Sequence, residues 1–193
     1  MSRGMLAVCL CLGLVACGDN ETKDQATANE AAGNAATAQA QSGTDIAEAL
    51  GQSGDHSSFM QAVETAGLTQ TLRGVGPYTV FAPNNAAFEA IPAETREGLN
   101  SAAQRERLIA LLSYHIVPGT VTAQDIGRAI DSGQGGRAEL ATVAGDNLTL
   151  SRDGDAVVVT DGSGARARVV QADQLHSNGV VHSVDAVLMP ATE

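Results

Sequence analysis

The amino-acid sequence predicts a single mixed α+β domain over residues 44–193 of a 193-residue chain. Apolar residues recur at helical spacing as far as Ile130, whereas from Ala138 onward they alternate with polar residues and are separated by turn signals, as in strands. No internal repeat is present. A segment of about 150 residues buries roughly 68–70% of the surface of its unfolded chain, which is enough for a core without metal or disulfide.

Three helices are predicted from the spacing of their apolar residues. The first opens at Ser58 with a capping-box pattern and ends at Gly67, a C-terminal cap. The second opens at Ser101, and a third, shorter helix covers residues 121–130. The apolar faces of the first two helices are Phe59, Met60, Val63 and Ala66, and Leu108, Leu111, Leu112 and His115.

Two segments far apart in the sequence have strong local signals. Residues 78–82 alternate as a strand does, and Pro83 ends that strand because its ring removes a ladder donor. Asn84 is then an N-cap for a helix in which Phe88 is placed to pack on Pro83 as a hydrophobic staple. Asn178-Gly179 supplies the φ > 0 positions of a tight turn, and residues 180–188 run on as a strand.

Three segments of this chain, Tyr78–Phe88, Leu111–Gly119 and Ser177–Pro190, resemble the first motif, the Tyr-His motif and the second motif of the fasciclin (FAS1) domain family, in that order. The resemblance covers roughly residues 44–190 and implies a single FAS1 domain, a compact β-sheet wedge with a helical layer. The motif residues expected to have a structural role are Pro83, Asn84, Phe88, Asn178, Gly179, His182 and Asp185.

The first sixteen residues are predicted to be a lipoprotein signal peptide. Arg3 gives a positive start, and the apolar run 5–14 is too short for a bilayer, which needs about twenty residues. Leu14-Val15-Ala16-Cys17 resembles the bacterial lipobox, in which the sulfur of the last Cys is acylated; an ordinary secretory signal is the alternative. Cys9 and Cys11 would leave with the signal, so no disulfide is expected in the mature domain.

Residues 17–43 are predicted to be a lipidated cysteine and a flexible linker. The linker has no aromatic or large aliphatic residue with which to offset the entropy of ordering. Acyl chains such as palmitate on both the sulfur and the amine of Cys17 would meet the two-chain requirement for stable membrane anchoring. The expected location is the bacterial cell envelope, and Gly18 after the cysteine implies the outer membrane if the source is Gram-negative.

The sequence contains no recognised catalytic or cofactor-binding motif. It has no G-x-S-x-G elbow, Walker loop or dinucleotide glycine loop, so neither catalysis nor a cofactor is expected. His182 and Asp185 lie an odd number of residues apart and point to opposite faces of a strand, so no metal site is expected. Asp153, Asp155 and Asp161 are interpreted as solvated turn carboxylates, because they lack the glycine and glutamate of an EF-hand loop.

The resemblance assigns a contact region to Tyr114, His115 and Asp173. In animal members of the family the Tyr-His region is implicated in integrin binding, as is an Asp-Ile pair before the second motif. Here Gln174 follows Asp173, so only the aspartate of that pair matches. The alternative interpretation is structural: Tyr114 packs with its hydroxyl bonded, and His115 bonds a backbone group at the helix end.

The acidic composition narrows the possible partners. The formal net charge is −11, and removal of residues 1–16, which contain Arg3 as their one charged residue, makes it −12. Nucleic acid and bare anionic membrane are therefore unfavourable partners. The sequence and the FAS1 resemblance together predict a membrane-anchored, non-catalytic module for cell-surface or periplasmic protein contact, adhesion or self-association. The alternatives are an enzyme or small-ligand carrier with an unrecognised pocket, and a purely structural envelope protein.

Replacing Cys17 by serine tests the anchor. Cys17→Ser should abolish labelling of the protein by a fatty-acid probe and leave it unprocessed or released, because the hydroxyl cannot take the place of the acylated sulfur. Cys11→Ser is the matched control, since Cys11 would leave with the signal and its loss should not change labelling. Fatty-acid label that persists in Cys17→Ser would contradict the prediction.

Overall fold

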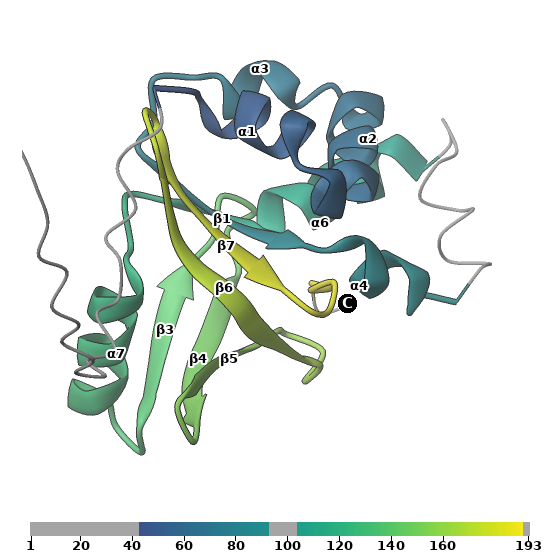
Figure 1. The fold of residues 1–193 in the computed structure, drawn as a ribbon. Helices are drawn as coiled ribbons and strands as arrows, with labels where there is room; N and C mark the ends of the chain where they lie inside the picture. Colours follow the sequence, from purple (N-terminus) through teal and green to yellow (C-terminus); the bar gives the residue numbers. More distant parts are fainter. Residues whose placement is uncertain (1–42, 93–103, 191–193) are drawn as a thin grey trace, which may run out of the picture. The chain divides into compact units, whose positions relative to one another are not determined.

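A seven-stranded β-sheet frames the domain in the computed structural model, which describes residues 43–92 and 104–190 (Figure 1). The strands lie in the order β2-β1-β7-β6-β5-β4-β3, and all neighbouring pairs are antiparallel except β1 and β7. They are β1 Tyr78–Pro83, β2 Ile116–Pro118, β3 Arg137–Ala141, β4 Asn147–Asp153, β5 Ala156–Thr160, β6 Arg166–His176 and β7 Gly179–Val184.

Helices precede, interrupt and cover this sheet. Within the described ranges they are α1 Ile46–Gln52, the 3-10 helix η1 Gly54–His56, α2 Ser57–Ala66, α3 Thr69–Leu72, α4 Asn85–Glu89, α6 Arg105–Tyr114 and α7 Ala123–Ser132. The predicted signal peptide, Cys17, the linker and the helix start at Ser101 lie outside the described residues. None of the helices in the described part of the chain combines the length and the apolar composition that a membrane crossing requires.

The sheet closes on itself as a barrel-like wedge. Strand β6 is 11 residues long and pairs with β5 through its first part and with β7 through most of its length. Its register against β7 shifts twice between Val169 and Gln174, and such bulges bend a strand. At the opposite edges, the backbone N–H of Val143 after β3 donates to Ile116 O of β2 at 2.8 Å. The α+β wedge with a helical layer is therefore confirmed.

Two apolar cores lie on either side of β1, whose successive side chains alternate between them. Val80 and Ala82 belong to the core under the helical layer, and Phe81 belongs to the core within the sheet. The helical layer over β1 and β7 is visible in Figure 1. The helical core includes Ile46, Leu50, Phe59, Leu72, Leu108 and Leu112, and the sheet core includes Ile126, Leu148, Leu150, Val159 and Leu188.

The first predicted helix has the predicted apolar face but a different start. All four residues of that face are buried, and Gly67 at φ 78° ends the helix as a left-handed cap. The predicted capping box at Ser58 is wrong, because α2 already begins at Ser57. The backbone N–H of Ser58 instead donates to the side-chain Oδ1 of Asn85 at 3.0 Å. A residue of another helix therefore satisfies this helix end, which local sequence could not show.

The other helix predictions hold with small shifts. The apolar face of α6 is buried as predicted, including His115 at its C-terminal end. Helix α7 covers 123–132 rather than 121–130, because Thr122 and Asp125 form a capping box that starts it. Asn84 caps α4 as predicted, its Oδ1 accepting the N–H of Ala87 at 2.8 Å.

Strand β7 ends at Val184, so the predicted strand over 180–188 is four residues too long. Beyond it, Asp185 closes the ladder with β6: its N–H donates to Arg168 O at 3.1 Å and its Oδ1 accepts the N–H of Arg168 at 2.7 Å. The chain then leaves the sheet, and the N–H of Leu188 donates to the ring of His115. Val187 and Leu188, the buried apolar residues after Val184, lie in a loop and not in a strand.

Position 179 requires glycine mainly because there is no room for a side chain. Its φ is 155°, and a Cβ built at this position would overlap the backbone carbonyl of Tyr78 and lie 2.9 Å from Ile46 Cδ1. Tyr78 and Gly179 are the first partners of the parallel β1–β7 pair. The close approach of these two strands therefore excludes a side chain, which adds to the turn conformation predicted from the sequence.

Substitution of Gly179 should destabilise the domain. Gly179→Ala is expected to lower the free energy of unfolding by more than about 1 kcal/mol, because the new methyl group forces β1 and β7 apart. Urea denaturation followed by circular dichroism measures the change. Gly51→Ala in α1 is the matched control: a Cβ there meets nothing within 4 Å, and alanine favours a helix. Equal unfolding midpoints for Gly179→Ala and the wild type would refute the close approach.

Candidate functional site

The Tyr-His pair predicted as a contact region lies in the interior. Tyr114 and His115 each have 0% of their surface exposed. The hydroxyl of Tyr114 donates to Asn147 O at 3.2 Å and accepts the N–H of Gly162 at 2.8 Å. The prediction that these side chains form a contact surface is therefore corrected, because neither can touch a partner of the folded domain. Both residues instead have the structural role given above as the alternative, with the side chain packed in the interior and bonded to backbone groups.

His115 links the end of α6 to the C-terminal segment. Its Nδ1 lies 2.8 Å from Leu111 O, a carbonyl that can only accept, so Nδ1 carries the proton. Its Nε2 then accepts the N–H of Leu188 at 3.1 Å. Complete burial lowers the pKa of His115 from 6.5 to about 4, against the Leu111 hydrogen bond, which raises it. A neutral imidazole is thus part of the folded structure at pH 7.

His182 makes a second buried link, with the opposite tautomer. Its Nε2 donates to Val121 O at 2.8 Å, and its Nδ1 accepts the N–H of Asp173 at 3.3 Å. The ring stacks on Phe81, with centroids 5.4 Å apart. Burial lowers the pKa of His182, opposed by its hydrogen bond to Val121 and by the charge of Asp173. His182 therefore joins β7 to the bulge of β6 and to the segment before α7.

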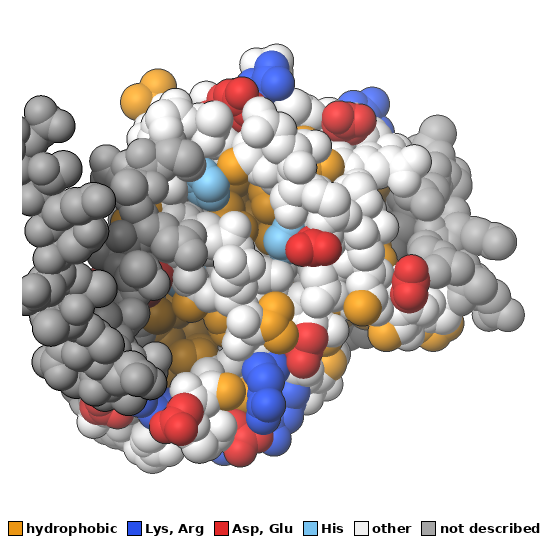
Figure 2. Space-filling model, in the orientation of Figure 1, with side chains coloured by type: hydrophobic (Ala, Val, Ile, Leu, Met, Phe, Trp, Pro, Cys, Tyr) orange, Lys and Arg blue, Asp and Glu red, His pale blue; other side chains and the backbone are white. Residues whose placement is uncertain are grey.

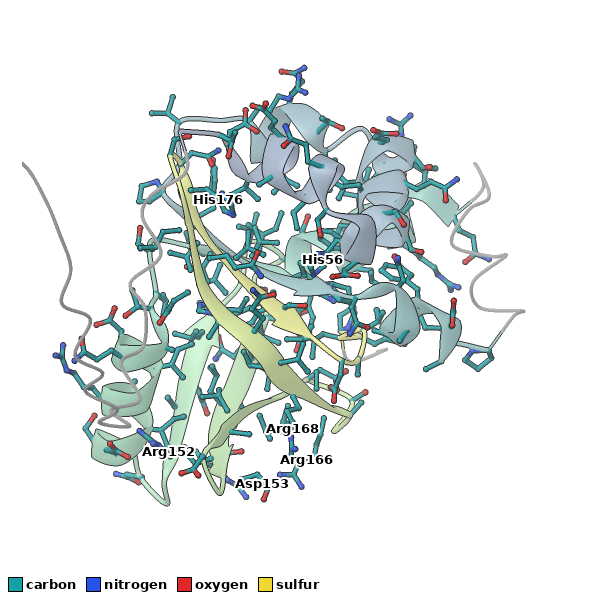
Figure 3. The ribbon with its side chains drawn as sticks, in the orientation of Figure 1. His56, Arg152, Asp153, Arg166, Arg168 and His176 are labelled. Atoms are coloured by element: carbon teal, nitrogen blue, oxygen red, sulfur yellow. The ribbon has the colours of Figure 1, made fainter. Side chains whose placement is uncertain are left out.

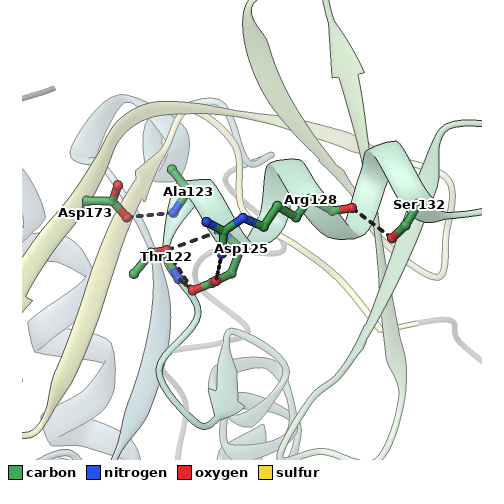
Figure 4. A network of polar contacts seen from close by, with 6 residues as sticks. All are labelled: Thr122, Ala123, Asp125, Arg128, Ser132 and Asp173. Carbon is green, nitrogen blue, oxygen red and sulfur yellow. Dashed lines mark hydrogen bonds and ion pairs between the residues drawn. The ribbon is translucent and has the colours of Figure 1, made fainter. Parts of the chain in front are cut away.

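Asp173 belongs to this second link, because its backbone N–H donates to His182, and not to the hydrogen bonds of Tyr114 or His115. It adopts φ 58° in the bulged part of β6, and its Oδ1 accepts the N–H of Ala123 at 2.7 Å (Figure 4). Ala123 is the first residue of α7, so this carboxylate satisfies a helix N-terminus. The three residues of the predicted contact region thus serve two separate internal networks.

Asp161 was predicted to be a solvated turn carboxylate, and that prediction is wrong. Only 6% of its surface is exposed. Its Oδ1 accepts the N–H groups of Ser163 and Ala165 at 2.9 and 2.8 Å, and its Oδ2 accepts that of Met189 at 2.8 Å. The Asp-Gly-Ser sequence is typical of a turn in which an aspartate bonds its own backbone two residues on, which could have indicated this role.

Asp153 and Asp155 are exposed, as predicted. Asp153 lies 4.0 Å from Arg166 and 3.9 Å from Arg168, and Figure 3 shows these three side chains together at one end of the sheet. All three are more than half exposed, so such ion pairs contribute little to stability. Among the described residues, no group of three or more His, Cys, Asp or Glu side chains is arranged to hold a metal ion.

Two of the hollows on the surface of the described domain bear on its function. One, of about 390 Å³, lies where η1, the start of α4, β6 and β7 meet. Its lining residues are Asp55, His56, Asn84, Asn85, Ala86, Val170, Gln171 and Ser183. Figure 2 shows a histidine surface beside an acidic one at the place where Figure 3 labels His56. No local sequence signal indicates this site, because its residues come from four separate segments of the chain.

The second hollow, of about 300 Å³, lies at the end of the sheet where the β6–β7 turn meets the loop before β1. Val75 of that loop is 98% exposed, the most exposed of the large apolar side chains in the described residues. Figure 3 places His176 at this end of β6. Other residues that line the hollow are Pro77, Thr120, Leu175 and Ser177.

Comparison with known proteins identifies the family of this fold. The family model described as Fasciclin domain matches residues 54–190. The chain belongs to the fasciclin domain family. It is 40% identical over 135 residues to Protein sll1483 of Synechocystis sp., a match that covers 69% of this chain and 67% of that protein. The predicted FAS1 resemblance is therefore confirmed.

Other fasciclin proteins share this domain within longer chains. The transforming growth factor-beta-induced protein ig-h3 of Sus scrofa is 35% identical over 134 residues, which are 69% of this chain but 17% of that protein. A solved FAS1 domain pair from the insect cell adhesion molecule Fasciclin I matches with a TM-score of 0.65 and 18% identity, over 78% of this chain and 51% of that one. The structural match shows a common fold.

The buried histidine should make stability depend on pH. The pKa of His115 falls from 6.5 in the unfolded chain to about 4 in the folded domain, so acidification protonates the unfolded chain first. The stabilising contribution of neutral His115 is complete above pH 6.5 and is lost as the pH falls towards 4. We expect the free energy of unfolding to drop by about 2 kcal/mol between pH 6.5 and about pH 5, from 1.36 kcal/mol per pH unit.

Urea titrations at several pH values measure this dependence. His115→Gln should reduce this dependence, whatever its effect on stability at pH 7, because glutamine does not titrate; burial also lowers the pKa of His182, which accounts for part of the slope that remains. His176→Gln is the comparison, since His176 is only partly buried and should leave most of the slope in place. An unfolding free energy of the wild type that does not change over this range would contradict a neutral buried His115.

Proposed function

We propose that this fasciclin domain is a lipid-anchored contact module of a bacterial cell envelope, and that the contact itself needs no catalysis. Fasciclin domains occur in cell-adhesion proteins, and the matching solved domain pair comes from an insect cell adhesion molecule. The observation that carries the proposal is the direction of the motif side chains. His115, His182 and Asn178 are all buried and form hydrogen bonds within the domain. What the motifs share with other fasciclin domains is thus internal architecture.

The outer surface must then supply the contacts. Val75 and Pro77 are exposed apolar side chains at the edge of one hollow, and a protein partner can bury such side chains. The acidic character of the chain, with a net charge of −11, favours a protein surface over nucleic acid. We assign the contact patch to Val75, Pro77, Leu175 and the β6–β7 turn, in place of Tyr114 and His115.

The anchor gives weak contacts a collective effect. A linker of about 26 residues after Cys17 has a root-mean-square span of roughly 25–30 Å, which keeps the domain near the membrane while it reorients. Many copies on one surface raise the effective concentration for partners on the same or an apposed membrane. Contact of this kind needs no cofactor. The alternative of a purely structural envelope protein predicts no such binding.

Clustering should therefore reveal the activity. Fragment 44–193 in solution should bind envelope preparations weakly, and the same fragment displayed densely on beads should bind them detectably. Val75→Ser should reduce bead binding several-fold, because a protruding apolar side chain is lost from the patch. Val143→Ser is the matched control, since Val143 is 48% exposed and lies outside this hollow. Beads that bind no better than beads carrying an unrelated acidic domain would refute the proposal.

A further inference from the structure

Three polar side chains, Ser53, His56 and Ser183, form a hydrogen-bonded chain from the end of α1 to strand β7. The Nδ1 of His56 lies 2.9 Å from Ser53 Oγ, and its Nε2 lies 2.9 Å from Ser183 Oγ. His56 is 3% exposed and Ser183 4%, so bulk water hardly reaches the bond between them. A hydroxyl bonded to an unprotonated imidazole is the arrangement that activates a serine nucleophile.

The protonation of His56 suits the role of a base. Burial lowers the pKa of His56, opposed by the nearby charge of Asp55, so the imidazole is neutral at pH 7. Both of its partners are hydroxyls, which can donate or accept. When Nδ1–H donates to Ser53 Oγ, Nε2 accepts the proton of Ser183. In that tautomer Ser53 is a positioning residue that holds the imidazole ring toward Ser183.

The pair lies in the wall of the 390 Å³ hollow, which has the size of a small-molecule site. Ala86 and Val170 supply an apolar part that suits a short acyl chain. The side-chain Oδ1 of Asn84 accepts the N–H of Ala87, which leaves its amide NH₂ as the group that can donate. The amides of Asn84 and Gln171 thus line the same hollow as possible donors to an oxyanion.

We infer that Ser183 and His56 form a nucleophile–base pair that hydrolyses short-chain acyl esters. Ser183 Oγ bonds to the acyl carbon while its proton passes to His56 Nε2. The bond from that carbon to the alcohol oxygen then breaks, and the alcohol leaves with the proton from His56. In the second half of the reaction, the oxygen of a water molecule attacks the acyl carbon while His56 Nε2 takes a proton from that water. The bond from the acyl carbon to Ser183 Oγ then breaks, the carboxylic acid departs, and Ser183 Oγ takes back the proton from His56 Nε2.

This activity is separate from the contact patch beside Val75 and does not depend on it. Among the four histidines of the chain, His115 and His182 bond backbone groups alone, whereas His56 bonds two side-chain hydroxyls. The Nε2 of His56 thus faces the hydroxyl of Ser183, which can become a nucleophile.

A fluorophosphonate reagent and p-nitrophenyl acetate, applied to the full 193-residue chain, test the inference. We expect the reagent to label the protein on Ser183, located by mass spectrometry of the labelled peptide. Ser183→Ala should remove both label and ester turnover. His56→Gln should slow labelling at least about 100-fold, the usual contribution of a general base. Ser53→Ala should lower kcat with little change in KM, because it orients the base and does not touch the ester.

Ser151→Ala, a serine on the partly exposed sheet surface, is the matched control and should label and turn over as the wild type does. Thermal unfolding of each variant shows whether it is folded. If Ser183→Ala does not fold, the site of labelling in the wild type decides the question. A wild-type chain that takes no label, or takes it at a residue other than Ser183, overturns the inference. So does ester turnover that is unchanged in folded His56→Gln.

Discussion

The side-chain amide of Asn178 is the contact on which the arrangement of this domain depends. Its Oδ1 accepts the N–H of Ile46 at 2.9 Å, and its Nδ2 donates to Leu72 O and Gly74 O at 2.7 and 3.0 Å. Its backbone carbonyl accepts the N–H of Tyr78 at 3.1 Å. One buried residue thus fixes α1, the end of α3 and the start of β1 on the β6–β7 turn. Because an unsatisfied buried amide is costly, these contacts are expected to form together.

The parallel pair of β1 and β7 follows from that contact. Tyr78 and Gly179 start the pair directly beside Asn178, although about 100 residues separate them in the chain. Closing a loop of this length costs conformational entropy, which the burial of β1 between two apolar cores offsets. The absence of a side chain at Gly179 lets the two backbones approach. The helical layer and the wedge of strands are thereby joined along one line of contact.

Buried polar groups extend this connection through the domain. His115 joins α6 to Leu188, His182 joins β7 to Val121 and the bulge at Asp173, and Asp161 holds the segment at Met189. In each case a side chain satisfies backbone groups that no strand or helix pairs. These residues are therefore constrained by the fold, whereas an exposed side chain such as Val75 is not. Strand β7 contributes both to an internal link and to a hollow, because His182 bonds internal backbone groups and its neighbour Ser183 lines the hollow beside His56.

The sequence by itself determined the elements whose signals are local. The N-cap at Asn84, the left-handed end at Gly67 and the apolar faces of α2 and α6 depend on residues within a few positions, and they were predicted correctly. The tertiary structure decided which polar groups are buried and what they bond. Asn85 caps a helix 27 residues away, and Ser183 meets His56 across 127 residues. Such pairings depend on how the strands are ordered and how the wedge closes. The spacing of residues along the chain does not show which distant residues will meet.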